Sequence, residues 1–372
     1  MNKEQYIEYP SASSLFDIIS KIGQGGFGIV YKARDIKTGN IVALKQINKM
    51  SKSNEGFPQP AFREILLLRD LKGCSNIIDL KDVVTCDIEK NVFIVYNYSE
   101  YDMHNLIYHK FPMSLLQVKS YLKQMIIGIK ELHSNGYIHR DIKPSNFLIS
   151  SENIVTLIDF GLSRKISHGF NNAQSSRYTD SVGTYFYRAP EIILGDSNYS
   201  TEIDIWSLGC TLYEMITREN LFSKCNTDAD IANQIIQIFG LPNEKEMKNL
   251  STLPNKDLFL NCKKRSTLTP DEFFEDKIPE EFKPMKNLLL QMLQIDPKKR
   301  ITADDALNNV VLSDAVPPEN LPPLTLSESL QKGISKSMTR SSSLQVELKK
   351  KQKMELKYEQ LRLAKILPLN IV

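Results

Sequence analysis

The 372-residue chain lacks the features that mark secreted proteins, proteins stabilised by a bound metal, and membrane-spanning proteins. No apolar run approaches the roughly 20 residues of a membrane-spanning helix, and the first residues have no apolar leader core. The cysteines are few and show no C-x-x-C spacing, which indicates a reducing compartment and predicts no metal site: Cys74, Cys86, Cys210, Cys225 and Cys262. These absences favour an intracellular protein, in the nucleus, the cytoplasm or both, with no membrane partner.

The charge is small overall but unevenly distributed. The net charge is +3, and residues 331–372 hold ten Lys or Arg against three Glu. The preceding 330 residues are therefore mildly acidic. The run Lys349–Lys353 is the most basic stretch, but it has no interleaved aromatic residues that could stack on bases. A solvated face or an import signal is the better interpretation of this run, and direct nucleic-acid binding is not favoured.

The most informative stretch is His139-Arg140-Asp141-Ile142-Lys143-Pro144-Ser145-Asn146, followed thirteen residues later by Asp159-Phe160-Gly161. One carboxylate in the first motif can orient a hydroxyl nucleophile. The Asn of that motif and the Asp of the second can hold magnesium. Phosphoryl transfer needs these parts because its chemistry is mostly positioning and charge neutralisation.

A glycine-rich stretch, Gly23–Val30, fits the pattern G-x-G-x-x-G-x-V. Alone it could be a dinucleotide loop or a plain hairpin. The dinucleotide version opens a helix, whereas the flanks here, residues 16–19 and 29–33, read as strands. We therefore expect a hairpin whose backbone amides can close over phosphates, because glycines allow a close approach.

Lys45 lies in an apolar strand, Val42-Ala43-Leu44-Lys45, seventeen residues after Gly28. A lysine there is costly unless it is paired, and a plain edge-strand lysine is the alternative interpretation. Residues 59–71 read as a helix that carries Glu64. A Lys45–Glu64 pair would hold Lys45 on the α- and β-phosphates of a nucleotide.

Three downstream motifs complete the pattern: Ala189-Pro190-Glu191, Asp204–Gly209 and Asp296–Arg300. With them the chain resembles a eukaryotic protein kinase over residues 10–312. The resemblance implies an α+β, bilobal fold with MgATP between a small β-rich N-lobe, which holds one regulatory helix, and a larger α-helical C-lobe. It also implies that Glu191 pairs with Arg300 and that Asp204 braces the catalytic loop. The expected divisions are an N-terminal extension (1–15), a kinase domain (16–312, with N-lobe 16–96, hinge 97–103 and C-lobe 104–312) and a Pro/Ser-rich linker with a basic, partly disordered tail (313–372).

Apolar residues at helical spacing predict C-lobe helices over 115–133, 205–217, 231–239 and 285–293. The resemblance also assigns roles to residues. Asp141 orients the substrate hydroxyl and accepts its proton, and Lys143 neutralises charge on the transferring phosphoryl group. Lys45 and Glu64 form the phosphate-binding pair described above, and Asn146 and Asp159 hold Mg²⁺. The implied ATP-binding residues are Ile22, Gly23, Gln24, Gly25, Gly26, Phe27, Gly28, Val30, Ala43, Lys45, Tyr96, Asn97, Ser99, Asp102 and Leu148.

Within kinases, residues 56–64 and 204–222 are similar to cyclin-dependent kinases, whereas the Thr-x-Tyr pair of mitogen-activated kinases is missing. The resemblance implies a cyclin-type subunit on the 59–71 helix and an upstream kinase that phosphorylates Thr179. A phosphothreonine needs cationic partners, and three arginines from three segments match the family positions: Arg63, Arg140 and Arg164.

Some residues depart from the family. The glycine loop has Gly26-Phe27 where the family has an inhibitory Thr-Tyr pair, so we expect that switch to be absent. The implied substrate pocket is Gly183, Thr184 and Arg188. Gly183 replaces a valine linked to a preference for proline after the target residue, and it leaves proline direction open.

Alternatives remain open at this stage. A pseudokinase scaffold would predict damage at Lys45, Asp141, Asn146 or Asp159, and none is damaged. A kinase of the same group that needs no cyclin is a further alternative. Residues 344–366 either form an independent basic segment or fold back as a helix onto the kinase body.

Overall fold

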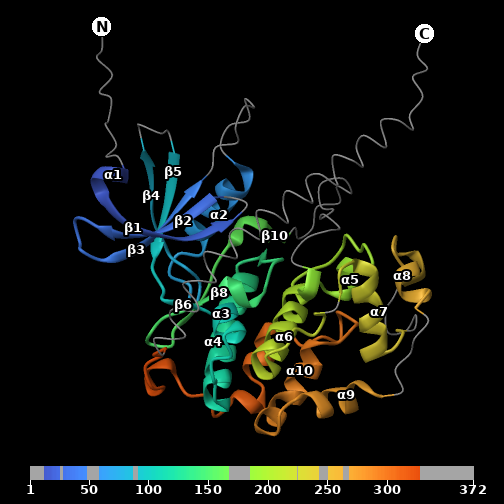
Figure 1. Cartoon of the computed structure of the whole chain (residues 1–372). Helices are drawn as coiled ribbons and strands as arrows, with labels where there is room; N and C mark the ends of the chain where they lie inside the picture. The colour runs from blue at the N-terminus through green and yellow to red at the C-terminus, as the bar shows by residue number, and fades with distance from the viewer. Residues whose placement is uncertain are drawn as a thin grey trace, which may run out of the picture. The chain divides into compact units, whose positions relative to one another are not determined.

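The computed structural model describes residues 12–25, 28–47, 58–86, 91–166, 185–223, 225–242, 250–262 and 268–326. These residues fall into two compact units (Figure 1). Unit 1 takes the described residues up to Pro58 and Lys81–Tyr98; unit 2 takes Gln59–Leu80 and Ser99–Thr325. Several predicted features lie outside the described residues: Gly26, Phe27, Thr179, Gly183, Thr184 and the segment 344–366.

Unit 1 is an antiparallel sheet preceded by one helical turn, α1 (Ala12–Leu15). Its strand order is β1-β2-β3-β5-β4, with β1 at Phe16–Gly25, β2 at Gly28–Asp35, β3 at Ile41–Ile47, β5 at Asn91–Asn97 and β4 at Leu80–Cys86. β1 and β2 form the hairpin expected of the glycine-rich stretch, with Gly25 opposite Gly28.

The two faces of this sheet carry different residues because side chains alternate along a strand. One face is the core of unit 1, a buried cluster of Phe16, Ala33, Val42, Leu44, Val84, Phe93 and Val95. The register places Val30 opposite Lys45 and Ala43 opposite Tyr96. Directly opposed residues share a face, so these four lie together on the side away from the core.

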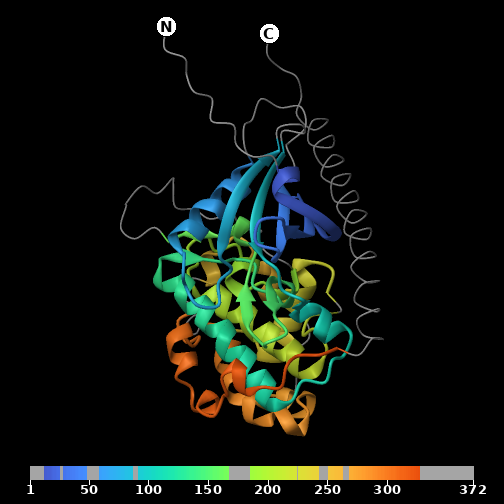
Figure 2. The same ribbon diagram turned by 90° about the vertical axis from the view of Figure 1, so that its left-hand side faces the viewer.

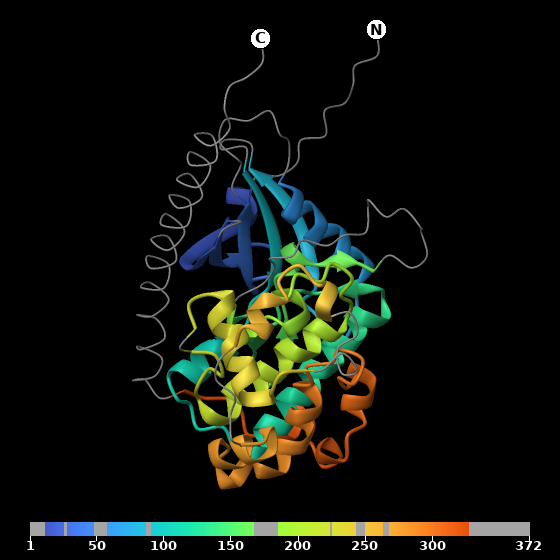
Figure 3. The same cartoon turned by 90° about the vertical axis from the view of Figure 1, so that its right-hand side faces the viewer.

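Unit 2 is mainly helical. Its α-helices are α2 (Gln59–Asp70), α3 (Met103–Tyr108), α4 (Leu115–Ser134), α5 (Pro190–Ile193), α6 (Glu202–Thr217), α7 (Asp228–Phe239), α8 (Asp257–Leu260), α9 (Pro270–Lys277), α10 (Lys286–Met292) and α11 (Ala303–Leu307). α4 and α6 pack against each other, α10 lies against α6, and α11 lies against α4; the orange helices α9 to α11 can be followed in Figure 3.

The predicted helices are present with adjusted ends. α7 begins three residues before the predicted start because Thr227 and Asp230 form a capping box. The predicted helix over 285–293 is present as α10 (Lys286–Met292), and a 3₁₀ segment, η5 (Glu280–Met285), directly precedes it. Pro284 in η5 cannot donate a helical hydrogen bond, which favours a start of α10 after this residue.

Short strands and 3₁₀ turns position the motif residues. β6 (Tyr101–Asp102), β8 (Phe147–Ile149) and β9 (Val155–Leu157) form one small sheet, and β7 (Tyr137–Ile138) pairs with β10 (Arg164–Lys165). The 3₁₀ turns are η1 (Pro144–Asn146), η2 (Phe160–Leu162), η3 (Tyr185–Tyr187), η4 (Leu250–Thr252), η6 (Val310–Leu312) and η7 (Pro318–Asn320).

The helix α2 belongs to the helical unit by its contacts, although the sequence grouped it with the strands of the N-lobe. It lies against η2, and the hydroxyl of Tyr137 on β7 donates to Asp70 at its end, at 2.5 Å. The glutamate-bearing helix is thus packed on the segment that begins at Asp159.

The chain after Leu312 packs on unit 2 rather than leaving it as a free linker. The Leu324 amide donates to the Ser151 carbonyl at 2.8 Å, and the Asn153 side-chain amide donates to the Pro322 carbonyl at 2.9 Å. Leu321 and Leu324 are buried. This segment, residues 313–325, is here called the strap; it can be followed at the orange-red end of the coloured ribbon in Figure 2.

No helix among the described residues is long and apolar enough to cross a membrane. Cys210 is buried in α6. Groups of three or more His, Cys, Asp or Glu side chains suited to a metal ion do not occur in the described part of the chain.

Candidate active site

The sheet of unit 1 gathers most of the predicted nucleotide-binding residues. Gly28 is required by packing, because a Cβ there would lie 1.7 Å from the Gln46 carbonyl oxygen. Gly23 is different: the nearest atom to a Cβ would be Val30 Cβ at 3.8 Å. Packing among the described residues therefore does not require a glycine at position 23, and the contact of Gly23 with a nucleotide stays a prediction.

The strand face away from the core carries Val30, Ala43, Lys45 and Tyr96, in the register given above. Tyr96 is 5% exposed, and Lys45 is half-buried. Ile22, Gln24 and Gly25 lie on β1, and Asn97 ends β5 with its side chain exposed. All described nucleotide-binding candidates of unit 1 thus lie within the strands of one sheet or at the ends of those strands.

The remaining predicted nucleotide-binding residues lie in unit 2. Asp102 on β6 is directly opposite Leu148 on β8. The Asp102 carboxylate caps α3, accepting from the Asn105 backbone amide at 2.8 Å. Burial raises the pKa of the Asp102 carboxyl above its ordinary value. This carboxylate therefore has a structural task, and its contact with a nucleotide stays a prediction, as does that of the half-buried Ser99.

The catalytic loop of unit 2 brings Asp141, Lys143 and Asn146 together. Lys143 Nζ lies 2.6 Å from Asp141 Oδ2. The Asn146 side-chain amide donates to the Asp141 carbonyl at 2.7 Å and approaches its carboxylate at 3.3 Å. Asp141 is 8% exposed, so one carboxylate is held by a cation and an amide in a largely buried position.

A magnesium ion fits the residues that were assigned to it. The hydrogen bond to Asp141 uses the amide nitrogen of Asn146, which leaves its Oδ1 as the atom able to bind a cation. Asp159 supplies carboxylate oxygens. Mg²⁺ is commonly bound by one or two such protein oxygens, with water and phosphate oxygens completing its shell.

His139 connects the catalytic loop to the Asp159 segment. Its Nε2 lies 3.0 Å from the Ile158 carbonyl oxygen, which can only accept, so Nε2 carries a proton. Its Nδ1 then accepts from the Asp141 amide at 3.3 Å. The ring packs edge-on against Phe160 at 5.1 Å between centroids. Asp159 itself has a left-handed backbone with φ 66°, a strained conformation that surrounding contacts must hold.

Asp204 at the start of α6 braces the catalytic loop, as the sequence predicted. Its Oδ2 accepts from the His139 amide and its Oδ1 from the Arg140 amide, both at 2.9 Å. His133 Nε2 lies 2.8 Å from Oδ2, a contact that the sequence did not reveal. Burial alone would raise the pKa of the Asp204 carboxyl, but the bonds from His133 and the charges around it hold that pKa below its ordinary value.

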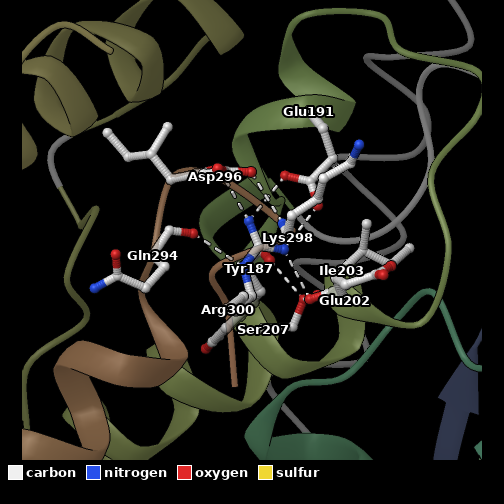
Figure 4. Close-up of polar contacts among 10 residues, drawn as sticks. Tyr187, Glu191, Glu202, Ile203, Ser207, Gln294, Asp296, Lys298 and Arg300 are labelled. Carbon is white, nitrogen blue, oxygen red and sulfur yellow. Dashed lines mark hydrogen bonds and ion pairs between the residues drawn. The ribbon is translucent and has the colours of Figure 1, made fainter. Parts of the chain in front are cut away.

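The predicted Glu191–Arg300 ion pair is present and buried. Arg300 Nη1 and Nη2 donate to the two Glu191 carboxylate oxygens at 2.7 and 3.0 Å. The same guanidinium donates to the carbonyls of Glu202 and Gln294, as Figure 4 shows. Nearby, the Ser207 hydroxyl donates to the Tyr187 carbonyl at 2.7 Å. The Ala-Pro-Glu segment is thereby fastened to α6 and to the loop after α10.

Two of the three predicted phosphate-binding arginines converge on one carbonyl. Arg140 Nε and Arg164 Nη1 both donate to the Leu162 oxygen, at 2.8 and 3.3 Å. Arg63 lies half-buried on α2, the helix that packs against the turn containing Leu162. Glu64 on the same helix is 3% exposed, which does not fit a solvated surface carboxylate.

Arg188 is the one predicted substrate-pocket residue within the described part of the chain. Its guanidinium lies over the Tyr185 ring at 4.2 Å and binds the Asp228 carboxylate at 2.9 Å. Asp228 is the first residue of α7. Sequence reasoning did not identify this partner, because the two residues are forty positions apart.

Residues 16–312 match the family model described as the protein kinase domain. The chain belongs to the protein kinase family. Two curated rice relatives fall within this family and are named for cyclin dependence. Cyclin-dependent kinase G-2 of Oryza sativa subsp. indica is 38% identical over 303 residues, covering 79% of this chain. Cyclin-dependent kinase G-1 of the same subspecies is 36% identical over 298 residues, again covering 79% of this chain.

The kinase chain spans only 41% and 42% of the length of these two relatives. A solved structure, the CAK complex of Chaetomium thermophilum bound to ATP-gamma-S, contains a chain similar to it. The TM-score is 0.74 at 29% identity, and the match covers 84% of this chain and 96% of that one. These similarities confirm the fold class and the family expected from the sequence motifs.

Proposed function

We propose that this kinase chain is an active serine/threonine protein kinase that transfers the γ-phosphoryl group of MgATP to protein hydroxyls. The observation that carries the proposal is the group of Asp141, Lys143 and Asn146, held on the buried Asp204 carboxylate. Asp141 accepts the proton of the substrate hydroxyl and orients its oxygen. Lys143 neutralises charge on the transferring group, and a lysine at this position resembles the serine/threonine pattern.

The nucleotide assignments extend this proposal to both units. Lys45 would bind the α- and β-phosphates, and Val30, Ala43 and Tyr96 would line the adenine site on their strand face. The Lys45–Glu64 pair stays a prediction. Asn146 and Asp159 would hold Mg²⁺, which would supply positive charge to neutralise the phosphate groups. The similar CAK complex carries an ATP analogue, which supports a nucleotide site in this chain.

Two substitutions test the enzymatic role. Asp141→Asn should leave ATP binding intact and lower turnover by orders of magnitude, because the base and the orientation of the nucleophile are lost. Lys45→Met should abolish turnover by misplacing the phosphates. Turnover is measured with a generic protein substrate and radiolabelled ATP, and nucleotide binding by calorimetry. Near-wild-type turnover in either variant would show that the role assigned to that residue is wrong.

We also propose that a cyclin-type subunit activates the chain by binding α2. Phe62 and Leu66 are 51% and 42% exposed on this helix, an apolar surface that a partner can cover. Glu64 lies on the same helix, so binding there can shift the population of its active position. The names of the rice relatives support this choice of partner.

Phosphorylation of Thr179 by an upstream kinase is part of the same proposal. Arg140 and Arg164 already converge on one carbonyl, so a phosphate there would meet two cations. Whether the kinase prefers substrates with proline after the target residue stays open because of Gly183. We further propose that the protein is intracellular.

Activation by a subunit is tested by purification. The isolated chain should be nearly inactive, and co-expression with candidate cyclins should raise turnover. Phe62→Ser should prevent that rise, whereas Phe273→Ser on α9 is the control for a phenylalanine away from α2. Full activity of the purified monomer without a co-purifying subunit would refute the cyclin proposal and leave the kinase proposal intact.

A further inference from the structure

The segment from Tyr199 to Asp204 binds both the backbone and the side chain of Arg140. The Asp204 carboxylate accepts from the Arg140 backbone amide at 2.9 Å. The Arg140 guanidinium Nη1 donates to the Tyr199 hydroxyl oxygen at 2.8 Å. Tyr199 lies five residues before Asp204, in the connection between α5 and α6, and is 5% exposed.

Arg140 needs such support because its backbone is strained. Its φ is 71°, in the left-handed region that non-glycine residues rarely adopt. Such conformations persist only where the surrounding contacts hold them. Arg140 directly precedes Asp141, so the direction in which the Asp141 carboxylate points depends on this strained residue.

The side-chain contacts of Arg140 fix the guanidinium in two directions. Its Nε donates to the Leu162 carbonyl, which belongs to the turn after Asp159. Its Nη1 is held by the Tyr199 hydroxyl on the other side. A buried hydrogen bond to a charged group is among the stronger ones in proteins, so the tyrosine hydroxyl is well suited to keep the guanidinium in one position.

We infer that Tyr199 is a positioning residue for the kinase reaction, acting through the Arg140 guanidinium on the catalytic loop at Asp141. The catalytic part of this inference rests on the proposed function. The competing interpretation is that Tyr199 only fills space with its ring and that its hydroxyl has no functional effect.

Tyr199→Phe tests the inference, because it removes the hydroxyl and keeps the ring. Tyr121→Phe is the matched control: the Tyr121 hydroxyl is also buried and donates to Asn153 Oδ1 at 2.6 Å, next to the strap. Tyr199→Phe should lower kcat by about two- to tenfold, the range that one net hydrogen bond corresponds to, with KM for ATP unchanged. Tyr121→Phe should leave kcat unchanged at a comparable loss of Tm. An unchanged kcat in Tyr199→Phe would overturn the inference.

A double-mutant cycle with Arg140→Ala shows whether the effect passes through Arg140. Once the guanidinium is absent, Tyr199→Phe should cause no further loss of kcat. The same fold loss in both backgrounds would overturn the inference, because the hydroxyl would then act by another route.

Arginine side-chain NMR supplies a readout that needs no kinase activity. The Nε–H resonance of Arg140 is assigned by its disappearance in Arg140→Ala. This proton should exchange with water faster in Tyr199→Phe than in the wild type, and at the wild-type rate in Tyr121→Phe. Unchanged exchange would overturn the inference. If the wild-type chain transferred no phosphate, the proposed function would fail, and the exchange rates would still decide whether Tyr199 holds Arg140.

Discussion

Arg300→Met should be among the most destabilising single substitutions in unit 2. The Arg300 side chain is fully buried and Glu191 is 2% exposed. The substitution keeps similar volume but leaves the Glu191 carboxylate without the cation that binds both of its oxygens. It also removes the donors that satisfy the carbonyls of Gln294 and Glu202.

The size of the effect follows from burial. Breaking a buried pair by removing one partner costs about 3–5 kcal/mol, because the other charge stays buried and unpaired. The Trp206 ring, 5.3 Å from the guanidinium, loses a cation contact as well. For a domain of this size, each kcal/mol lowers Tm by roughly 2–4 °C, so we expect a decrease on the order of 10 °C.

The assay is thermal unfolding followed by far-UV circular dichroism, repeated with a urea titration. Lys283→Met is the control: Lys283 forms ion pairs with Glu275 and Glu280 at the surface. Exposed pairs contribute little, so this variant should unfold at the wild-type temperature. If Arg300→Met also unfolded within a degree or two of wild type, the buried pair would not have the structural weight that its geometry indicates.

Two further predictions concern acid stability and the strap. The pKa of Asp204 is lower in the folded than in the unfolded state, so the unfolded state binds this proton more readily. The contribution of Asp204 to the free energy of unfolding is therefore complete above the ordinary carboxyl pKa and is lost as pH falls through the lower folded value. Asp204→Asn should flatten the decrease of stability with acid between about pH 4 and 2, and an unchanged slope would contradict the assignment. A chain ending at Leu326 should keep Tm and peptide phosphorylation, whereas one ending at Leu312 should lose several degrees because buried Leu321 and Leu324 are removed. Calorimetry of the two truncations would contradict the role of the strap if their Tm values agreed.

The sequence alone determined the local parts of the site. The glycine hairpin, the strand of Lys45 and the turn that groups Asp141 with Asn146 each depend on a few contiguous residues, whose spacing and conformational limits are visible in the chain. The ordered motifs also determined the family and, with it, the Glu191–Arg300 pair across 109 positions. For the ATP-binding, metal-binding and phosphosite residues the roles stay predictions.

Tertiary structure alone decided which single residues support those motifs. His133 on Asp204, Tyr199 on Arg140 and Asp228 on Arg188 are lone side chains brought together over 40 to 71 positions. A lone histidine or tyrosine has no periodicity or spacing that distinguishes it from a core residue. The strap differs from its sequence prediction for the same reason. Its prolines predict an extended linker, but the burial of Leu321 and Leu324 depends on the position of the turn between β8 and β9. Such contacts depend on packing between distant segments, which local sequence pattern does not encode.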